Sequence, residues 1–218
     1  MNSPEDRKYL WYFGGHRLEW QGRLDKTSGA RRGAVDDLPV LVVDGLMTPA
    51  QNAQLFQWLS NLPFTRTEFA REETRAFLHW VHKLSVAECE RLPLYAAAVG
   101  AVETWFPERG PQRCYRTYCN SATYGDMLFT HTDSQPGVEE LTALWYIAPR
   151  WDLEWGGETI LFNAAGDAEF VVSPRPGRLL VFDGRIRHVG RAPNRVCVIP
   201  RLTFALKFEP LTARVPAV

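Results

Sequence analysis

Hydrophobic residues follow helical spacing in the first half of the chain and strand-like spacing in the second half. Residues 1–37 are polar and rich in glycine and arginine, apart from an aromatic group at residues 9–13 and Trp20. Chain ends are commonly held loosely, so we interpret this segment as an arm whose aromatic side chains cover the core, with a lid over the substrate site as the alternative. The β-branched run at residues 38–44 then predicts a short buried strand.

A helix is predicted directly after this strand. Thr48 as the N-cap, Pro49 at the first helical position and Gln51 three residues after the cap form the sequence of a capping box. Apolar residues then recur at helical spacing: Leu55, Trp58, Leu59 and Leu62. This pattern is typical of a helix packed on a sheet.

Three further segments complete the first half. Residues 64–70 alternate in polarity and predict a strand. His79 and His82 follow it, but their segment offers no third metal ligand, so we assign them to the core or to the rim of a substrate site. Residues 86–106 predict an amphipathic helix, with Pro93 as a possible break near its start.

From residue 113 onward the pattern changes to strands separated by glycine and proline turns. Seven or eight such strands fit a closed double sheet, the jelly roll or double-stranded β-helix. The fold class is therefore α+β and mainly β, with helices between residues 49 and 106 bracing one outer face. We expect a single domain, divided into an arm (1–37), a strand and helix support (38–112), a jelly-roll catalytic core (113–209) and a tail (210–218).

Composition excludes several classes of protein. Lys plus Arg and Asp plus Glu balance at 25 each, so no net charge favours nucleic acid or an anionic membrane as partner. The four cysteines lack C-x-x-C spacing and are expected to be free thiols. The charged N-terminus does not resemble a signal peptide and no apolar run reaches the roughly 18 residues of a membrane span, which predicts a cytoplasmic protein.

A candidate metal site is indicated by a His-x-Asp pair. Residues two apart on a strand point to the same face, so His131 and Asp133 would present an imidazole and a carboxylate to one point, while Thr132 turns away. A second histidine would complete the two-His-one-carboxylate arrangement that holds iron(II). Of the five histidines, His188 is the best candidate, because it follows an apolar strand and a Gly-Arg turn.

A candidate anion site accompanies the metal site. Arg201 opens a strand of mainly apolar residues, and a buried guanidinium needs an anion such as the dicarboxylate 2-oxoglutarate. In the strand at residues 141–147, Thr142, Leu144 and Tyr146 share one face. This mixed face suits a dicarboxylate better than the opposite, more apolar face.

Residues from about 118 to 209 resemble the catalytic core of the prolyl 4-hydroxylase-like branch of the iron(II)/2-oxoglutarate-dependent oxygenases. The matching segments occur in the order of that branch: Tyr-Gly-Asp at 124–126 before His131 and Asp133; residues 141–147; Trp151 and residues 155–158; residues 176–182 leading into His188; and residues 201–203. The resemblance implies the same jelly-roll fold. It also implies that His131, Asp133 and His188 are the iron ligands.

The resemblance further implies roles around 2-oxoglutarate. Tyr146 would donate its hydroxyl to the distal carboxylate and Arg201 would form the main ion pair with it. Thr203, on the same strand face as Arg201, would add a hydrogen bond, and Tyr118 is a further donor. The expected cofactors are Fe(II), 2-oxoglutarate as co-substrate and O2, with ascorbate as a reductant.

The expected activity is hydroxylation of an unactivated C–H bond with release of succinate and CO2. Related halogenases have Ala or Gly at the position of Asp133, so its presence favours hydroxylation. The substrate would be a small molecule, an amino acid or a peptidyl group, and aromatic and arginine residues are expected at the mouth of the site: Trp80, Tyr115, Arg116, Trp145, Trp151, Trp155 and Arg187. Two alternatives are a non-catalytic jelly-roll binding module and a cupin-type metal enzyme, which would not need Arg201.

Overall fold

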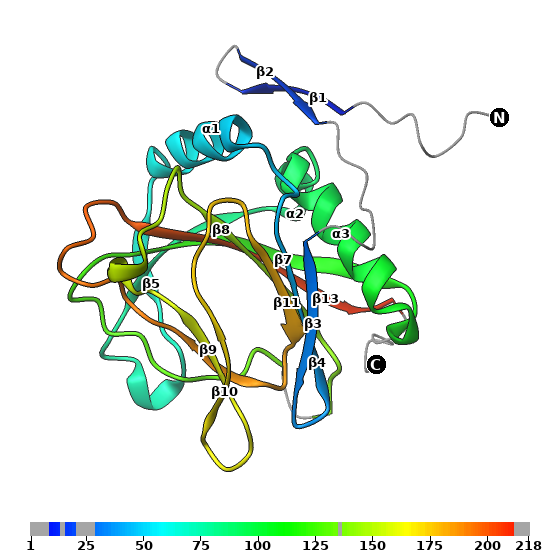
Figure 1. Cartoon of the computed structure of the whole chain (residues 1–218), viewed down its shortest axis with the longest axis vertical. Helices are drawn as coiled ribbons and strands as arrows, with labels where there is room; N and C mark the ends of the chain where they lie inside the picture. Colours follow the sequence, from blue (N-terminus) through cyan, green and yellow to red (C-terminus); the bar gives the residue numbers. More distant parts are fainter. Residues whose placement is uncertain (1–8, 14–15, 21–28, 135–136, 212–218) are drawn as a thin grey trace, which may run out of the picture.

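A large antiparallel sheet forms the frame of the molecule (Figure 1). The computed structural model describes residues 9–13, 16–20, 29–134 and 137–211. The eight strands of the sheet lie in the order β3, β4, β11, β8, β13, β7, β6, β5. In sequence order their bounds are β3 Ala30–Val35, β4 Leu38–Val43, β5 Thr65–Glu68, β6 His79–Leu84, β7 Gln112–Ala122, β8 Leu141–Ile147, β11 Leu179–Asp183 and β13 Arg201–Pro210.

A smaller sheet faces the large one and completes the double-stranded β-helix. Its strands are β9 (Thr159–Phe162), β10 (Ala168–Val172) and β12 (Arg187–Gly190), in the order β10, β9, β12. An apolar cluster packs between the two sheets and includes Val42, Tyr146, Leu161 and Phe182. This antiparallel, mainly β architecture agrees with the jelly-roll prediction.

Helices cover the outer face of the large sheet (Figure 1). They are α1 (Pro49–Ser60), α2 (Val86–Cys89) and α3 (Pro93–Trp105), and the short 3-10 turns are η2 (Glu72–Thr74), η3 (Pro107–Arg109) and η4 (Leu153–Trp155). The predicted capping box is confirmed, because Gln51 N–H donates to Thr48 Oγ1 at 3.2 Å and Thr48 N–H donates to Gln51 Oε1 at 2.8 Å. A second apolar cluster fills the space between helices and sheet, where Leu55 and Leu59 of α1 are buried.

Three predictions about local structure are corrected. The segment expected as an arm already contains β3, which pairs with β4, and a hairpin of β1 (Tyr9–Phe13) with β2 (His16–Trp20). The helix predicted at residues 86–106 is two helices, because Pro93 lacks a backbone N–H and starts α3 instead of continuing α2. Trp145 does not lie at the mouth of the site: its ring is fully buried and its Nε1–H donates to the Leu94 carbonyl at 3.2 Å.

Two further expectations can be compared with the described residues. All four cysteines are free thiols, as expected. No helix among the described residues is both long enough and apolar enough to span a membrane.

Candidate metal and co-substrate site

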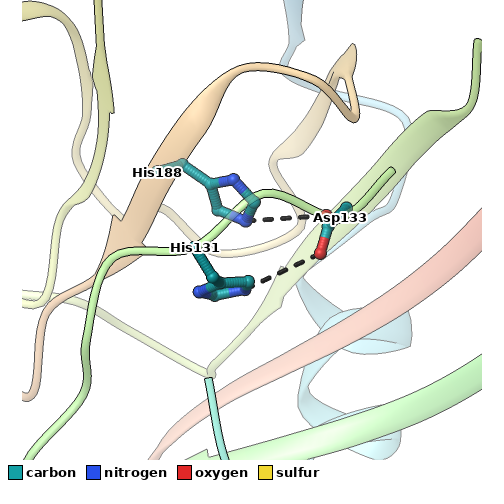
Figure 2. A group of neighbouring side chains, drawn as sticks. All are labelled: His131, Asp133 and His188. Carbon is teal, nitrogen blue, oxygen red and sulfur yellow. Dashed lines mark ion pairs between the residues drawn. The ribbon is translucent and has the colours of Figure 1, made fainter. Parts of the chain in front are cut away.

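The three predicted metal ligands converge on one point inside the double-stranded β-helix. One ligand atom each from His131, Asp133 and His188 lies within 4.8 Å of the others, and this is the candidate metal cluster found among the described residues. His131 Nε2 lies 3.6 Å from Asp133 Oδ1, and His188 Nε2 lies 3.5 Å from Asp133 Oδ2. Figure 2 shows all three side chains pointing toward one another.

Backbone hydrogen bonds bring the two histidines together. His131 N–H donates to the His188 carbonyl at 3.0 Å, and His188 N–H donates to the His131 carbonyl at 2.9 Å. His188 lies on β12, directly after the turn that follows β11. His131 does not lie on a strand, which corrects the sequence prediction: this pairing with His188 is an isolated bridge, and Asp133 lies in the bend that follows.

Both imidazoles are oriented by carbonyl groups two residues earlier in the chain. His131 Nδ1 lies 3.1 Å from the Phe129 carbonyl, and His188 Nδ1 lies 2.9 Å from the Ile186 carbonyl. A carbonyl can only accept, so each Nδ1 carries a proton and Nε2 is the ring nitrogen that faces Asp133. Burial lowers the pKa of His188 to about 4, which keeps this ring neutral and available as a metal ligand at pH 7.

The Asp133 carboxylate is held in its ionised form by a buried lysine. Burial by itself would raise the pKa of Asp133, but the Lys207 ammonium, with His188 and His131, outweighs it and holds that pKa well below its usual range. Lys207 forms an ion pair with Asp133 Oδ2 and donates to Thr142 Oγ1 at 2.9 Å. Thr142 in turn donates to Asp133 Oδ2 at 2.6 Å. Lys207 and Thr142 therefore both hold Oδ2.

The backbone of Asp133 is fixed by the turn after β11. Asp133 N–H and Ser134 N–H both donate to the Gly184 carbonyl, at 2.8 and 3.0 Å. Gly184 leaves no room for a side chain, because a Cβ there would come within 2.2 Å of Ser134 Oγ. This close approach places Asp133 beside the histidine bridge.

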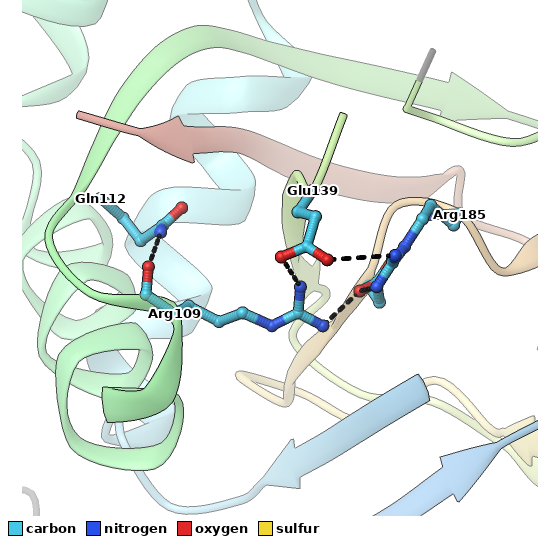
Figure 3. Close-up of polar contacts among 5 residues, drawn as sticks. Arg109, Gln112, Glu139 and Arg185 are labelled. Carbon is cyan, nitrogen blue, oxygen red and sulfur yellow. Dashed lines mark hydrogen bonds and ion pairs between the residues drawn. The ribbon is translucent and has the colours of Figure 1, made fainter. Parts of the chain in front are cut away.

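An ion-pair network anchors the same turn to the helical layer (Figure 3). The carboxylate of Asp183, which is fully buried, accepts from Arg109 Nη2 at 2.5 Å and from Arg185 Nη2 at 2.7 Å. Glu139 bridges the same two arginines, and Gln112 Nε2–H donates to the Arg109 carbonyl at 2.7 Å. Arg109 ends η3, so the network ties the helical layer to the turn that holds Asp133.

Arg201 lies buried in the same cavity. Its Nε–H donates to the Gly157 carbonyl at 2.6 Å, and Nη2 donates to Thr159 Oγ1 at 3.0 Å. Tyr146 donates its hydroxyl to the same Thr159 oxygen at 2.7 Å. A Cβ on Gly190 would lie 3.1 Å from Nη2, so this glycine leaves the space that the guanidinium occupies.

The Arg201 guanidinium lacks a counter-ion among the residues that the structure describes. No carboxylate there forms an ion pair with it, and burial lowers its pKa despite the opposing influence of Tyr146 and Glu158. A buried cation without a partner is unfavourable. The arrangement fits a ligand that carries a carboxylate.

One cavity of about 210 Å³ is lined both by the three candidate metal ligands, at one end, and by Arg201, at the other. Most of the predicted site residues line it: Tyr118, His131, Asp133, Thr142, Leu144, His188, Arg201 and Thr203. Tyr146 lies just behind this lining and reaches it through Thr159. His79 also lines the cavity, whereas His82 Nδ1 contacts the Pro63 carbonyl at 3.0 Å and is not among the lining residues.

Sequence reasoning missed Lys207 and Thr159. Lys207 has the same strand parity as Arg201 and Thr203, so the argument that selected Thr203 would have selected it as well. Its position in an apolar run suggested only a strand of the core. Thr159 had no signal in the sequence, because it becomes recognisable only when β9 lies beside Tyr146 and Arg201.

Comparison with known proteins agrees with this geometry. Residues 118–208 match the family model described as the 2OG-Fe(II) oxygenase superfamily. No curated protein matches the sequence.

Solved structures with the same fold include several oxygenases. An oxidoreductase of the 2OG-Fe(II) oxygenase family from Burkholderia pseudomallei is 16% identical with a TM-score of 0.59, covering 78% of this chain and 84% of that one. HygX from Streptomyces hygroscopicus, with nickel and 2-oxoglutarate bound, is 15% identical with a TM-score of 0.57, covering 81% and 85%. A prolyl-4-hydroxylase from Pseudomonas putida is 18% identical with a TM-score of 0.54, covering 84% and 94%.

These likenesses establish the fold, and the family match adds the sequence pattern from Tyr118 to Phe208. The His-Asp-His cluster lies within that matched segment. Residues 118–208 therefore carry both the sequence pattern of the 2OG-Fe(II) oxygenase superfamily and the His-Asp-His cluster.

Proposed function

We propose that the protein is an iron(II)- and 2-oxoglutarate-dependent dioxygenase that hydroxylates an unactivated C–H bond and releases succinate and CO2. One observation carries this proposal. A single cavity has two imidazoles and a carboxylate at one end and, at the other, a buried guanidinium for which the described residues supply no counter-ion. The first set suits iron(II), and the guanidinium suits the distal carboxylate of 2-oxoglutarate.

His131, Asp133 and His188 would hold the metal. When bound, iron(II) supplies the adjacent coordination positions at which 2-oxoglutarate and O2 meet. The carbonyls that accept from each Nδ1–H keep the rings from rotating, so both Nε2 atoms remain directed at the metal. Lys207 and Thr142 occupy Asp133 Oδ2, which leaves Oδ1 as the freer ligand atom.

Arg201 would bind the distal carboxylate of 2-oxoglutarate, assisted by Thr203 and Thr159. Thr159 Oγ1 already accepts from Tyr146 and from Arg201, so its own proton is available to donate to a carboxylate. Tyr146 would then act by orienting Thr159 or, after a small rotation, by direct donation. Leu144 and Phe182 line the space between the two ends and make it less polar, which strengthens the ionic contacts.

The choice of reaction and substrate is supported by residue identity and by relatives. Asp133 provides the carboxylate ligand that favours hydroxylation over halogenation. Among the structures of similar fold, HygX from Streptomyces hygroscopicus has hygromycin B bound. A prolyl hydroxylase from Trichoplax adhaerens is in complex with a hypoxia inducible factor peptide fragment. A small molecule, an amino acid or a peptidyl group is thus the proposed substrate range. A cupin-type enzyme would not require Arg201, for which the described residues supply no carboxylate partner.

Succinate formation from 2-oxoglutarate tests the proposal. The purified protein, supplied with iron(II) and ascorbate, should form succinate slowly even without organic substrate. Arg201→Lys keeps the charge but loses the planar fork, so the KM for 2-oxoglutarate should rise about tenfold or more, as expected for a lost charge-assisted hydrogen bond of roughly 1.5–3 kcal/mol.

The matched control is Arg195→Lys, because Arg195 is exposed and does not line the cavity. Its KM for 2-oxoglutarate should equal that of the wild type. An absence of succinate from the wild-type protein would refute the proposed activity. An unchanged KM in Arg201→Lys would move the carboxylate site to another residue.

A further inference from the structure

The positive and negative charges of the residues that line the cavity do not balance. They are Glu68, Arg116, Asp133, Arg201 and Lys207. With histidines neutral, three cations face two carboxylates, which leaves a net charge of +1 by this count. Iron(II) and the dianion 2-oxoglutarate would cancel each other, so the excess positive charge persists in the loaded site.

Pairing within the cavity identifies the cation that remains for the substrate. Lys207 is paired with Asp133. Arg201 would be paired with 2-oxoglutarate, an assignment that rests on the proposed function. Arg116 is the remaining cation, because its carboxylate partner Glu68 is also paired with Lys83.

The carboxylate beside Arg116 is shared with a second cation. Arg116 Nη2 contacts Glu68 Oε2 at 3.2 Å, whereas Lys83 Nζ contacts Glu68 Oε1 at the shorter distance of 2.6 Å. Among the described residues, this contact with Glu68 is the only polar bond of the Arg116 side chain. Arg116 can therefore turn to a ligand without leaving Glu68 unpaired, and its other N–H groups are available.

Strand pairing places Arg116 next to the metal site. Lys207 of β13 lies opposite Arg116 of β7 on one side and opposite Thr142 of β8 on the other. Directly opposed residues of an antiparallel pair project from the same face, and neighbouring strands lie about 4.8 Å apart. Arg116 is thus one strand beyond the lysine that contacts Asp133.

An aromatic ring supports the guanidinium in this position. The Arg116 Cζ atom lies 4.8 Å from the centre of the Tyr118 ring, a cation–π contact that restricts the guanidinium. The side chain remains 46% exposed, so the group is accessible from solvent. A planar guanidinium of this kind matches the two oxygens of a carboxylate.

We propose that Arg116 binds a carboxylate of the organic substrate, and that the substrate class is a small carboxylic acid, free amino acids included. The acid would enter beside Glu68 and Phe69 and place a C–H bond a few atoms from its carboxylate next to the metal. The cavity of about 210 Å³ also has to hold 2-oxoglutarate, so the space left beside the metal site suits a small group.

The test uses the full chain with iron(II), ascorbate and 2-oxoglutarate, and measures succinate release above the substrate-free rate. The probes are free amino acids and short aliphatic monocarboxylic acids, each compared with its primary amide. At least one acid should stimulate release, and its amide should stimulate at least tenfold less. Binding is measured separately, as the shift in melting temperature that each probe causes in the complex with nickel(II) and 2-oxoglutarate.

Substitutions then locate the carboxylate. Arg116→Gln should raise the KM for the stimulating acid at least tenfold and abolish its melting shift, while leaving the KM for 2-oxoglutarate unchanged. Arg116→Lys should restore part of the affinity. The matched control is Arg66→Gln: Arg66 also stacks on an aromatic ring, at 5.8 Å from Trp80, and is 51% exposed, but it does not line the cavity.

Each other result overturns the inference in a distinguishable way. Substrate-free succinate release without stimulation by any acid would exclude small carboxylic acids as the substrate class and leave the proposed activity intact. Equal stimulation by acid and amide would show that the carboxylate is not recognised. A raised KM for 2-oxoglutarate in Arg116→Gln would assign Arg116 to the co-substrate. No release under any condition would refute the proposed function itself.

Discussion

Replacing Lys207 by methionine should destabilise the metal-free protein severely. Lys207 is 4% exposed, and its ammonium is the positive charge in contact with the buried Asp133 carboxylate. Methionine has nearly the same length, so no cavity opens and the effect isolates the charge. Removing one partner of a buried ion pair costs about 3–5 kcal/mol, because the other charge is left uncompensated.

Lys83→Met is the matched control. Lys83 forms a short contact with Glu68 at 2.6 Å, but its side chain is 63% exposed. Exposed ion pairs contribute about 0–1 kcal/mol, so this variant should be close to wild type. Equilibrium unfolding in urea, with a chelator present, gives the free energy of unfolding of all three proteins.

A divalent metal should recover much of the loss in Lys207→Met. Nickel(II) supplies the positive charge that Asp133 lacks, so it should stabilise the variant more than it stabilises the wild type. By linkage, tenfold tighter binding corresponds to about 1.4 kcal/mol of additional stabilisation. Equal losses in the two lysine variants, or equal stabilisation by nickel(II) of variant and wild type, would refute the reasoning.

Four other substitutions test separate parts of the site assignment. Gly190→Ala places a methyl group about 3.1 Å from Arg201 Nη2, so the KM for 2-oxoglutarate should rise severalfold while metal content, measured by elemental analysis, stays the same. Asp133→Gly should lose iron, because a hydroxylase site is arranged for a carboxylate. The competing outcome is chlorination of the substrate, which mass spectrometry of products formed in high chloride would detect. Full hydroxylase activity in this variant would show that Asp133 is not a ligand. His79→Ala and His82→Ala should keep the metal stoichiometry of the wild type, and loss of metal in either would redirect the ligand assignment.

Local features of the fold could be predicted because their causes are local. The Thr48 capping box depends on residues three apart, and strand composition alone indicated β4. The two helices around Pro93 show the limit of periodicity, since the apolar spacing continues across a residue that cannot continue the backbone hydrogen bonds.

The candidate site could be predicted in its residue types but not in its connections. The His-x-Asp spacing selects His131 and Asp133, the position after an apolar strand and a turn selects His188, and the cost of burying a guanidinium selects Arg201. The sequence does not indicate that Thr142 bonds Asp133, since that contact depends on how the bend at Asp133, held by the Gly184 carbonyl, lies against β8. Whether Thr142 also contacts 2-oxoglutarate stays a prediction.

The ion-pair network at the turn that holds Asp133 could not be predicted either, because its members are far apart in the sequence. Asp183 and Arg109 are distant in sequence and meet only because η3 lies beside the turn after β11. Neither residue belongs to a motif, so the network that holds this turn becomes visible only in three dimensions.

The paired backbone hydrogen bonds between His131 and His188 have a consequence for how this site can change during evolution. They join main-chain atoms, so they do not depend on which side chains occupy the two positions. Cysteine or glutamate at position 188 would project from the same backbone bridge toward the same point. New ligand sets, and with them a preference for other metals, can therefore be reached by single substitutions that leave the scaffold intact.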